Sequence, residues 1–144
     1  MNEKEYLEDR LENQISWYSR ESKSNQFWFK MLRLVEIVAA ASIPFISGMA
    51  DSICYSEWII GFLGIGIAIA AASSALFKLQ ENWIQYRTTC EQLKHEKYLY
   101  LTKAQPYNSD NCLAILVQRV EGLISKENSS WAQHQAKNDE KVAS

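Results

Sequence analysis

The sequence is poor in the residues that interrupt helices and in those that build most metal and redox sites. Its 144 residues include five glycines, two prolines, two histidines and three cysteines, and no glycine or proline precedes Pro44. The cysteines, Cys54, Cys90 and Cys112, are odd in number and form no CxxC pair, which argues against a disulfide framework or a zinc motif. Neither a strand-like alternation nor an internal repeat is present. These absences predict an all-helical chain.

Signatures of enzymes are also missing. Gly61, Gly64 and Gly66 have the letters of a phosphate-binding loop but lie inside an apolar run, where such a loop does not form. Glu91 and His95 are spaced as a helical metal pair, yet the sequence around them is that of a charged, solvated helix face. The net charge of −2 and the lack of a basic cluster argue against nucleic acid as a partner. We expect no enzymatic activity, no catalytic residue, no metal site and no cofactor.

The most distinctive feature that is present is a run from Trp58 to Phe77 without a charged side chain. As a helix with a rise of about 1.5 Å per residue, this run spans roughly 30 Å, the thickness of the hydrocarbon core of a bilayer. A second apolar run extends from Leu34 to Ala50, and a short polar segment separates the two. The sequence therefore predicts a two-span helical hairpin in the membrane, with spans at residues 31–50 and 58–77 and a loop at residues 51–57.

Lysine and arginine are distributed unequally around the two apolar runs. The segment between the runs, DSICYSE, has none, whereas both flanks carry several: Arg20, Lys23, Lys30, Arg33, Lys78, Arg87, Lys94 and Lys97. Because lysine and arginine near membrane spans stay on the cytoplasmic side, both termini are expected in the cytoplasm. The predicted location is the inner (plasma) membrane, as a multi-pass protein.

The flanks of the spans have the pattern of amphipathic cytosolic helices. Residues 1–30 carry an apolar face with steps of four and three, at Leu7, Leu11, Ile15 and Tyr18. Residues 78–104 are predicted to continue the second span into the cytosol, with a heptad seam at Leu79, Trp83, Tyr86, Cys90, Leu93 and Tyr100. Lys97 also falls on this seam and fits it poorly. The seam predicts packing against the N-terminal helix or against a neighbouring protomer.

A turn and a further helix are expected after this seam. The residues at 105–108 have turn chemistry, which ends the preceding helix. An amphipathic helix is predicted over residues 109–131, with apolar side chains at Leu113, Leu116, Val117, Val120, Leu123 and Ile124. Residues 132–144 are polar, and we expect them to be disordered.

Small residues are concentrated on two opposite faces of the predicted second span. At about 100° per residue, one face holds Gly61, Gly64, Ala68 and Ala72, and the opposite face holds Gly66, Ala70 and Ser73. In lipid, small residues mark the places where helix backbones approach one another closely. A lone hairpin needs a single such face, whereas a closed ring of hairpins uses both, so the two faces predict a homo-oligomer.

A polar stripe along the predicted first span is our candidate for a pore lining or gate: Arg33, Glu36, Ala40, Ser47 and Asp51. Ionisable groups at membrane depth usually face protein or a water-filled cavity. Arg33 and Glu36 also fit a simpler interpretation, an i,i+3 ion pair near the inner boundary, which we favour for these two residues. Ser47 likewise suits helix packing. An alternative lining of the pore is the face of the second span that holds Gly66, Ala70 and Ser73.

Two segments carry a resemblance to a known family. The run ENWIQYRTTCEQLKHEKYLY (residues 81–100) directly follows the Gly/Ala-rich span, and LVQRVEGLISKENSSWAQ (residues 116–133) includes Arg119, Glu121, Glu127 and Trp131. In both, the chain resembles the SLATT family, the SMODS- and SLOG-associating two-transmembrane effector domain, with its bacterial branches classed as domains of unknown function. The resemblance extends over nearly the whole chain. It implies a membrane effector that forms pores in bacterial defence and conflict systems and responds to a nucleotide second messenger or an associated sensor protein.

Two functions are therefore expected. The first is an oligomeric, ion-conducting pore, whose partners are the lipid bilayer, further copies of the chain, inorganic ions, and a sensor protein or nucleotide signal. The alternative is a non-conducting membrane anchor or scaffold whose cytosolic helices recruit a partner protein. Substitution of Glu36 or Ser47 should change conductance in a pore but only assembly in a scaffold. In a scaffold, substitutions at Trp83, Tyr86 and Leu93 should abolish partner binding.

Overall fold

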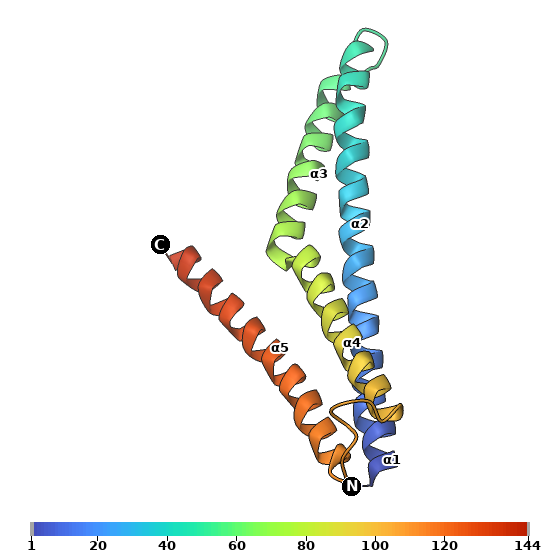
Figure 1. Cartoon of the computed structure of the whole chain (residues 1–144). Helices are drawn as coiled ribbons and strands as arrows, with labels where there is room; N and C mark the ends of the chain where they lie inside the picture. The colour runs from blue at the N-terminus through green and yellow to red at the C-terminus, as the bar shows by residue number, and fades with distance from the viewer. Residues whose placement is uncertain (1, 144) are drawn as a thin grey trace. The chain divides into compact units, whose positions relative to one another are not determined.

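Helices make up the fold in the computed structural model of the chain, which describes residues 2–143 apart from the side chains at 131, 134, 135, 138, 139, 142 and 143. No strand occurs in this part of the chain, which confirms the predicted all-helical class. The elements in chain order are α1 (Glu3–Glu5), the π-helix η1 (Tyr6–Glu12), α2 (Asn13–Gly48), α3 (Ser56–Phe77), α4 (Leu79–Leu101) and α5 (Cys112–Ala143) (Figure 1).

The chain divides into two compact units, and each has its own architecture. We call residues 1–22 together with 84–144 the bundle unit, and residues 23–83 the hairpin unit. The boundaries between the units fall inside α2 and α4, so each of these two helices contributes one end to each unit.

The bundle unit has a hydrophobic core built from the N-terminal helix (α1, η1 and the start of α2), α4 and α5. The core side chains come from all three segments and from the turn before α5: Tyr6, Leu11, Ile15, Tyr18, Cys90, Leu93, Tyr100, Tyr107, Leu116, Val120 and Ile124. A fully buried aliphatic or aromatic side chain contributes about 1.5–3 kcal/mol to folding in water. The apolar faces predicted for the N-terminal and C-terminal helices therefore meet the seam of α4 in one core.

The N-terminal apolar face differs from the predicted one at its first position. Tyr6 is buried, whereas Leu7 is only half-buried. Residues 6–12 form a π-helix, whose hydrogen bonds join positions five apart rather than four. Tyr6 therefore lies on the same face as Leu11. In an α-helix, Leu7 would occupy that position.

The hairpin unit contains the C-terminal part of α2, a loop at residues 49–55, α3 and the first turn of α4. The loop begins two residues earlier than predicted, because α2 ends at Gly48. α2 and α3 lie side by side (Figure 1). The less exposed side chains of α3 recur at steps of three and four, at Ile60, Leu63, Ile67, Ala70 and Ser74. Such a spacing is typical of one helix packed along another.

One helix in the described part of the chain is long and apolar enough to cross a membrane, by length and composition. It includes α3, which begins at Ser56 and ends at Phe77, close to the predicted second span at 58–77. The predicted first span lies in α2, where Glu36 and Pro44 interrupt the apolar run. The two-span topology thus stays a prediction.

The helix that contains α3 does not continue smoothly into α4, contrary to the prediction of one helix through residue 78. Lys78 has φ 46° and ψ 42°, the left-handed conformation that usually requires glycine at the end of a helix. For other residues this conformation costs roughly 1–2 kcal/mol. Asn82 stabilises the break, since its side-chain Nδ2 donates to the carbonyl of Phe77 at 3.0 Å and its backbone N–H donates to the carbonyl of Lys78 at 2.9 Å.

The C-terminal part also differs from its prediction. α4 ends at Leu101, and in the turn that follows the buried Tyr107 donates its backbone N–H to the carbonyl of Ala104 at 2.7 Å. α5 then runs from Cys112 to Ala143, so its backbone is helical where we expected disorder; residue 144 lies outside the described residues. The physical reason is composition: residues 132–143 lack glycine and proline and include three alanines, two glutamines and two lysines, which favour helix.

Candidate functional site

The sides of α3 that do not pack in the hairpin carry large hydrophobic side chains on the surface. Trp58 and Phe62 are each 69% exposed, Ile69 is 61% exposed and Leu76 is 80% exposed. Apolar surface in water costs about 25 cal/mol per Å². Monomeric soluble proteins rarely expose large contiguous apolar patches of this kind. The surface of α3 is therefore suited to an apolar environment.

The two small-residue faces of α3 have different surroundings in the hairpin unit. Gly61, Gly64, Ala68 and Ala72 are all exposed, and a Cβ added at either glycine would meet nothing within 4 Å. The hairpin therefore does not use this face for a close approach of its own helices. On the opposite face Ala70 is buried, Ser73 is half-buried and Gly66 is exposed.

The predicted polar stripe of α2 is brought together at one end only. Arg33 Nη1 lies 2.8 Å from Glu36 Oε2, so the two form the ion pair that their spacing suggests. Glu36 is buried, whereas the Arg33 side chain is 66% exposed. Ala40 and Ser47 are exposed farther along α2, and Asp51 lies in the loop after the helix. The ion pair therefore joins the first two residues of the stripe.

Pro44 gives the middle of the stripe a polar group that the side chains do not reveal. Proline has no N–H, and residue 44 is the position that would donate to the carbonyl of Ala40 in an α-helix. The carbonyl of Ala40 is therefore freed on an exposed part of α2. Ser42, two residues before the proline, uses its hydroxyl to bond the carbonyl of Val38 at 2.7 Å.

A recess of about 360 Å³ lies in the hairpin unit near the end of α3. Phe29, Arg33 and Glu36 of α2 line one side of it. The other lining residues come from the end of α3 and the start of α4: Ala71, Ser74, Ala75, Lys78, Gln80 and Glu81. The recess thus combines two cations and two anions with an apolar wall.

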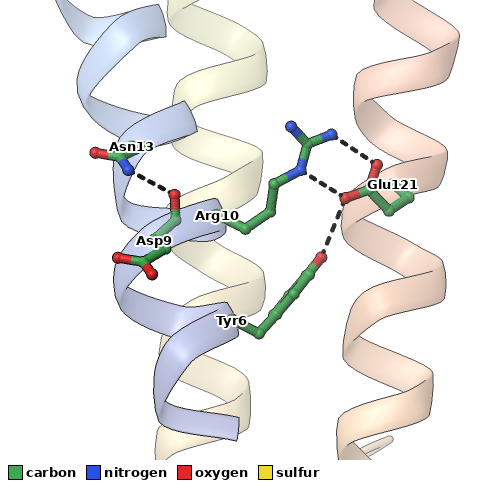
Figure 2. Close-up of polar contacts among 5 residues, drawn as sticks. All are labelled: Tyr6, Asp9, Arg10, Asn13 and Glu121. Atoms are coloured by element: carbon green, nitrogen blue, oxygen red, sulfur yellow. Dashed lines mark hydrogen bonds and ion pairs between the residues drawn. The ribbon is translucent and has the colours of Figure 1, made fainter. Parts of the chain in front are cut away.

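Polar side chains connect the helices of the bundle unit. Figure 2 shows Tyr6 and Arg10 of η1 pointing toward Glu121 of α5. The Arg10 guanidinium forms two hydrogen bonds with the Glu121 carboxylate, each 3.0 Å long, and the Tyr6 hydroxyl donates to the same carboxylate at 3.4 Å. The hydrogen bond from Arg10 lowers the pKa of Glu121. Burial and the Glu121 carboxylate raise the pKa of Tyr6 to about 12.

Three further tyrosines donate to carboxylates in the same unit. Tyr18 donates to the buried Glu127 at 3.1 Å, and Tyr100 donates to Glu3 at 2.6 Å. Tyr107 donates to the buried Glu96, whose other oxygen lies 3.0 Å from Arg119 Nη2. Burial raises the pKa of each of these tyrosines, and the neighbouring carboxylate raises it further. They therefore stay protonated donors throughout the physiological pH range.

A model of the family described as "Protein of unknown function (DUF4231)" matches residues 13–112. The chain belongs to the DUF4231 family. No curated protein and no solved structure shows significant similarity to it.

The match covers the hairpin unit of this DUF4231 protein and only part of its bundle unit. Tyr6 and Arg10 precede the matched region, and Glu121 and Glu127 follow it. The contacts of Tyr6 and Arg10 with Glu121 thus lie wholly outside the family match, whereas the Tyr18–Glu127 pair has its tyrosine inside it.

Sequence reasoning missed these polar pairs, although it singled out some of their members. Arg119, Glu121 and Glu127 are among the residues on which the SLATT resemblance rests, and the structure gives each an interhelical partner. The side chain of Trp131, the fourth, lies outside the described part. The sequence contained a signal for one of these pairs. Glu127 follows Val120 and Ile124 at steps of four and three, so the apolar face of α5 continues into an acidic residue that needs a partner when buried.

The predicted seam of α4 belongs to the bundle core over most of its length. Cys90, Leu93 and Tyr100 are buried, and the Cys90 thiol contacts the carbonyl of Ile15 at 3.6 Å. Tyr86 is half-buried, with its ring 5.7 Å from Trp17 and 6.0 Å from Tyr18. In the structure these positions of α4 pack against the N-terminal helix.

The remaining seam positions have other roles. Lys97, the poor fit, forms an ion pair with Glu12 of the N-terminal helix. Leu79 is buried and Trp83 half-buried, and both belong to the hairpin unit. Glu91 pairs with Lys94 at 3.2 Å. Among the described residues, no three His, Cys, Asp or Glu side chains converge as a metal site requires.

Proposed function

We propose that this DUF4231 protein is a two-span membrane protein of the SLATT type whose copies assemble into an ion-conducting pore of a bacterial defence system. The observation that carries the proposal is the surface of α3, whose residues 58–77 carry no charge and expose bulky hydrophobic side chains on the sides that do not pack in the hairpin. A bilayer is the environment in which such a surface is favourable.

The distribution of charge supports a second crossing by α2. The loop at residues 49–55 has no lysine or arginine, whereas Arg33 and Lys78 flank the apolar segments at their other ends. Under the positive-inside rule the loop lies outside, and both termini and the bundle unit lie in the cytoplasm.

The exposed small-residue face of α3 supports assembly. Gly61, Gly64 and Ala68 are not covered by the hairpin of their own chain, and they leave space for the helix of another copy. Close backbone approach at small residues is a main source of helix association in lipid. A ring of hairpins follows when each copy uses this face and the opposite one.

The stripe of α2 supplies polar groups for a lumen. A freed carbonyl at Ala40 and the exposed hydroxyl of Ser47 are unfavourable against lipid but are satisfied by water. Asp51 places a charge at the loop end of this stripe, whereas Glu36 at the other end is buried and paired with Arg33. In this proposal the stripe lines the pore and the bundle unit receives the sensor protein or nucleotide signal.

A scaffold is the second candidate, and one observation favours it. The bundle unit has a complete hydrophobic core and interhelical polar pairs within a single chain. Such a preformed module is able to recruit a partner protein without any conduction by the hairpin.

Single-channel recording of the purified protein in planar bilayers tests the pore. Wild type is compared with Glu36→Ala and Ser47→Leu, and Val38→Leu is the matched control because Val38 is exposed on α2 outside the stripe. We expect discrete openings whose conductance or ion selectivity changes in the two stripe variants and is unchanged in the control.

The other outcomes separate the alternatives. Openings that neither stripe variant changes would keep the pore and move its lining to the face with Gly66, Ala70 and Ser73. Silence that persists in the presence of cell lysate and candidate nucleotides would favour the scaffold.

A further inference from the structure

We propose that the recess of the hairpin unit binds the phosphate of an anionic phospholipid head group, with Arg33 and Lys78 as its cationic ligands. This inference rests on the membrane placement in the proposed function but not on ion conduction. Four observations carry it: the hydrogen-bond donors that remain in the recess, its apolar wall, the backbone conformation of Lys78, and the positions of the two cations next to the apolar runs.

The charged residues of the recess leave donors available for an anion. Arg33 uses Nη1 to bond Glu36 at 2.8 Å, and a guanidinium has five N–H donors in all. Lys78 Nζ lies 3.8 Å from Glu81, which is beyond hydrogen-bonding distance. Glu81 is also 67% exposed, so water screens its attraction for the ammonium. Two cations with unused donors therefore line the same recess, and the buried carboxylate of Glu36 is already paired with Arg33.

The rest of the lining suits an amphiphile rather than a free ion. Phe29, Ala71 and Ala75 form apolar walls, and the half-buried Ser74 adds a hydroxyl beside them. The volume of about 360 Å³ lies within the range of roughly 300–1,000 Å³ that small-molecule sites occupy. A phosphate at the charged side and hydrocarbon along the apolar side match this arrangement.

The backbone of Lys78 is a further observation that points to a ligand. Its φ of 46° is a conformation that glycine adopts without cost, and lysine occupies it here. Backbone strain of this kind is concentrated at ligand-binding and switch positions. The strained residue holds its ammonium at the recess, where a glycine would leave no charge.

The position of the recess along the chain agrees with a head group. Arg33 directly precedes the apolar run of α2, and Lys78 directly follows the charge-free run of α3. In the proposed topology both cations lie at the cytoplasmic interface, the depth at which basic pockets between membrane helices bind anionic lipids.

Thermal unfolding of the full-length protein in non-ionic detergent tests the site, with phosphatidylglycerol, phosphatidylcholine or inorganic phosphate added. We expect phosphatidylglycerol alone to raise Tm. Lys78→Gln and Lys78→Gly should each weaken the apparent lipid affinity roughly tenfold, the usual effect of losing one charged hydrogen bond. The matched control is Lys30→Gln, which removes an exposed cation of α2 outside the recess and should bind lipid as wild type does.

The glycine variant separates binding from folding. Without lipid, Lys78→Gly should unfold at the same or a higher temperature than wild type, because it relieves the left-handed strain. Loss of the lipid effect in a variant whose fold is intact would support the site.

Three results would overturn the inference. An equal loss of affinity in Lys30→Gln would show attraction to surface charge in general. An equal shift with phosphatidylcholine would show that the negative head group is not selected, and an equal shift with inorganic phosphate would make free phosphate the ligand.

Alkaline extraction of cell membranes distinguishes failure of this inference from failure of the proposed function. A chain that the extraction releases is not a spanning protein, and then both fail. A chain that stays in the membrane but gains no stability from phosphatidylglycerol contradicts the lipid site alone.

Discussion

The bundle unit and the hairpin unit use their hydrophobic residues in opposite ways. In the bundle unit, Leu11, Leu93 and Leu116 have no exposed surface, whereas Phe62 and Leu76 of the hairpin unit are largely exposed. The first arrangement stabilises a fold in water, and the second suits a solvent that is itself apolar. The two units therefore differ in where their apolar surface lies, and a single average hydropathy conceals the difference; under the proposed function the hairpin unit meets lipid and the bundle unit meets water.

The polar residues of the two units differ in the same sense. In the bundle unit, buried carboxylates accept hydrogen bonds from tyrosines on other helices, as with Tyr18 and Glu127. In the hairpin unit, the charged residues near α3 gather at the ends of its apolar run, with Glu57 at one end and Lys78 at the other. Polar bonds thus join the helices of the bundle, whereas the charges near α3 lie at the two ends of its apolar run.

The contrast between the two units has no physical basis if the hairpin does not cross a membrane. The native cysteines test whether it does. Cys54 is exposed in the loop and Cys90 is buried in the bundle unit. In right-side-out vesicles, a membrane-impermeant maleimide should label Cys54 and spare Cys90 and Cys112, because the bilayer shields the cytoplasmic side. After detergent and denaturant all three should react, and Cys54→Ser should abolish the labelling of intact vesicles. Labelling of Cys112 but not Cys54 would contradict the orientation.

A matched pair of leucine truncations sharpens the contrast in burial. Leu93→Ala removes a fully buried side chain and should destabilise the bundle by about 2–5 kcal/mol. Leu76→Ala removes a side chain that is 80% exposed and should change the unfolding free energy by less than about 0.5 kcal/mol. Urea denaturation in detergent, followed by circular dichroism, measures both. Equal losses would mean that α3 is packed by protein even in detergent.

A smaller effect is expected from deletion of one buried hydroxyl. Tyr18→Phe leaves the Glu127 carboxylate without this donor and should cost about 1–3 kcal/mol. Tyr98→Phe is the control, because the side chain of Tyr98 is 63% exposed, and it should have almost no effect. The same denaturation experiment compares them. A silent Tyr18→Phe would show that the hydroxyl does not stabilise the bundle.

The smallest effect concerns the pH dependence of the Arg10–Glu121 ion pair. Arg10 lowers the pKa of Glu121, so the pair contributes stability above the usual carboxyl pKa of about 4.3 and loses it as the pH falls through the lower folded value. Both side chains are 41% exposed, so we expect less than about 1 kcal/mol. The difference in unfolding free energy between wild type and Glu121→Gln should therefore shrink between pH 7 and pH 3. A difference that is constant with pH would assign the effect of the variant to something other than charge.

Much of the fold follows from local pattern. The charge-free run predicted α3 to within two residues, and the heptad spacing of Cys90, Leu93 and Tyr100 predicted the face of α4 that is buried. The first feature depends on the length of an uninterrupted apolar run, and the second on the repeat that any helix with one apolar side must show.

What could not be predicted depends on contacts between distant residues. The π-helical turn places Tyr6 rather than Leu7 on the buried face. It thereby brings the tyrosine hydroxyl to Glu121, 115 positions later in the chain. The left-handed Lys78 likewise has no signal in its own sequence, because glycine is the residue that normally marks such a break. For the candidate pore, periodicity places residues around one helix but does not say what that helix faces in an assembly.

The thiol of Cys90, which contacts the carbonyl of Ile15, can be used to measure how often the bundle unit opens. A thiol that is 3% exposed reacts with a reagent only when the surrounding helices separate, so its rate of modification reports how often the bundle opens. The exposed Cys54 reacts without any opening and provides the reference rate within the same molecule. The ratio of the two rates, followed while candidate signals are added one by one, would reveal a trigger that loosens the bundle without any recording of current.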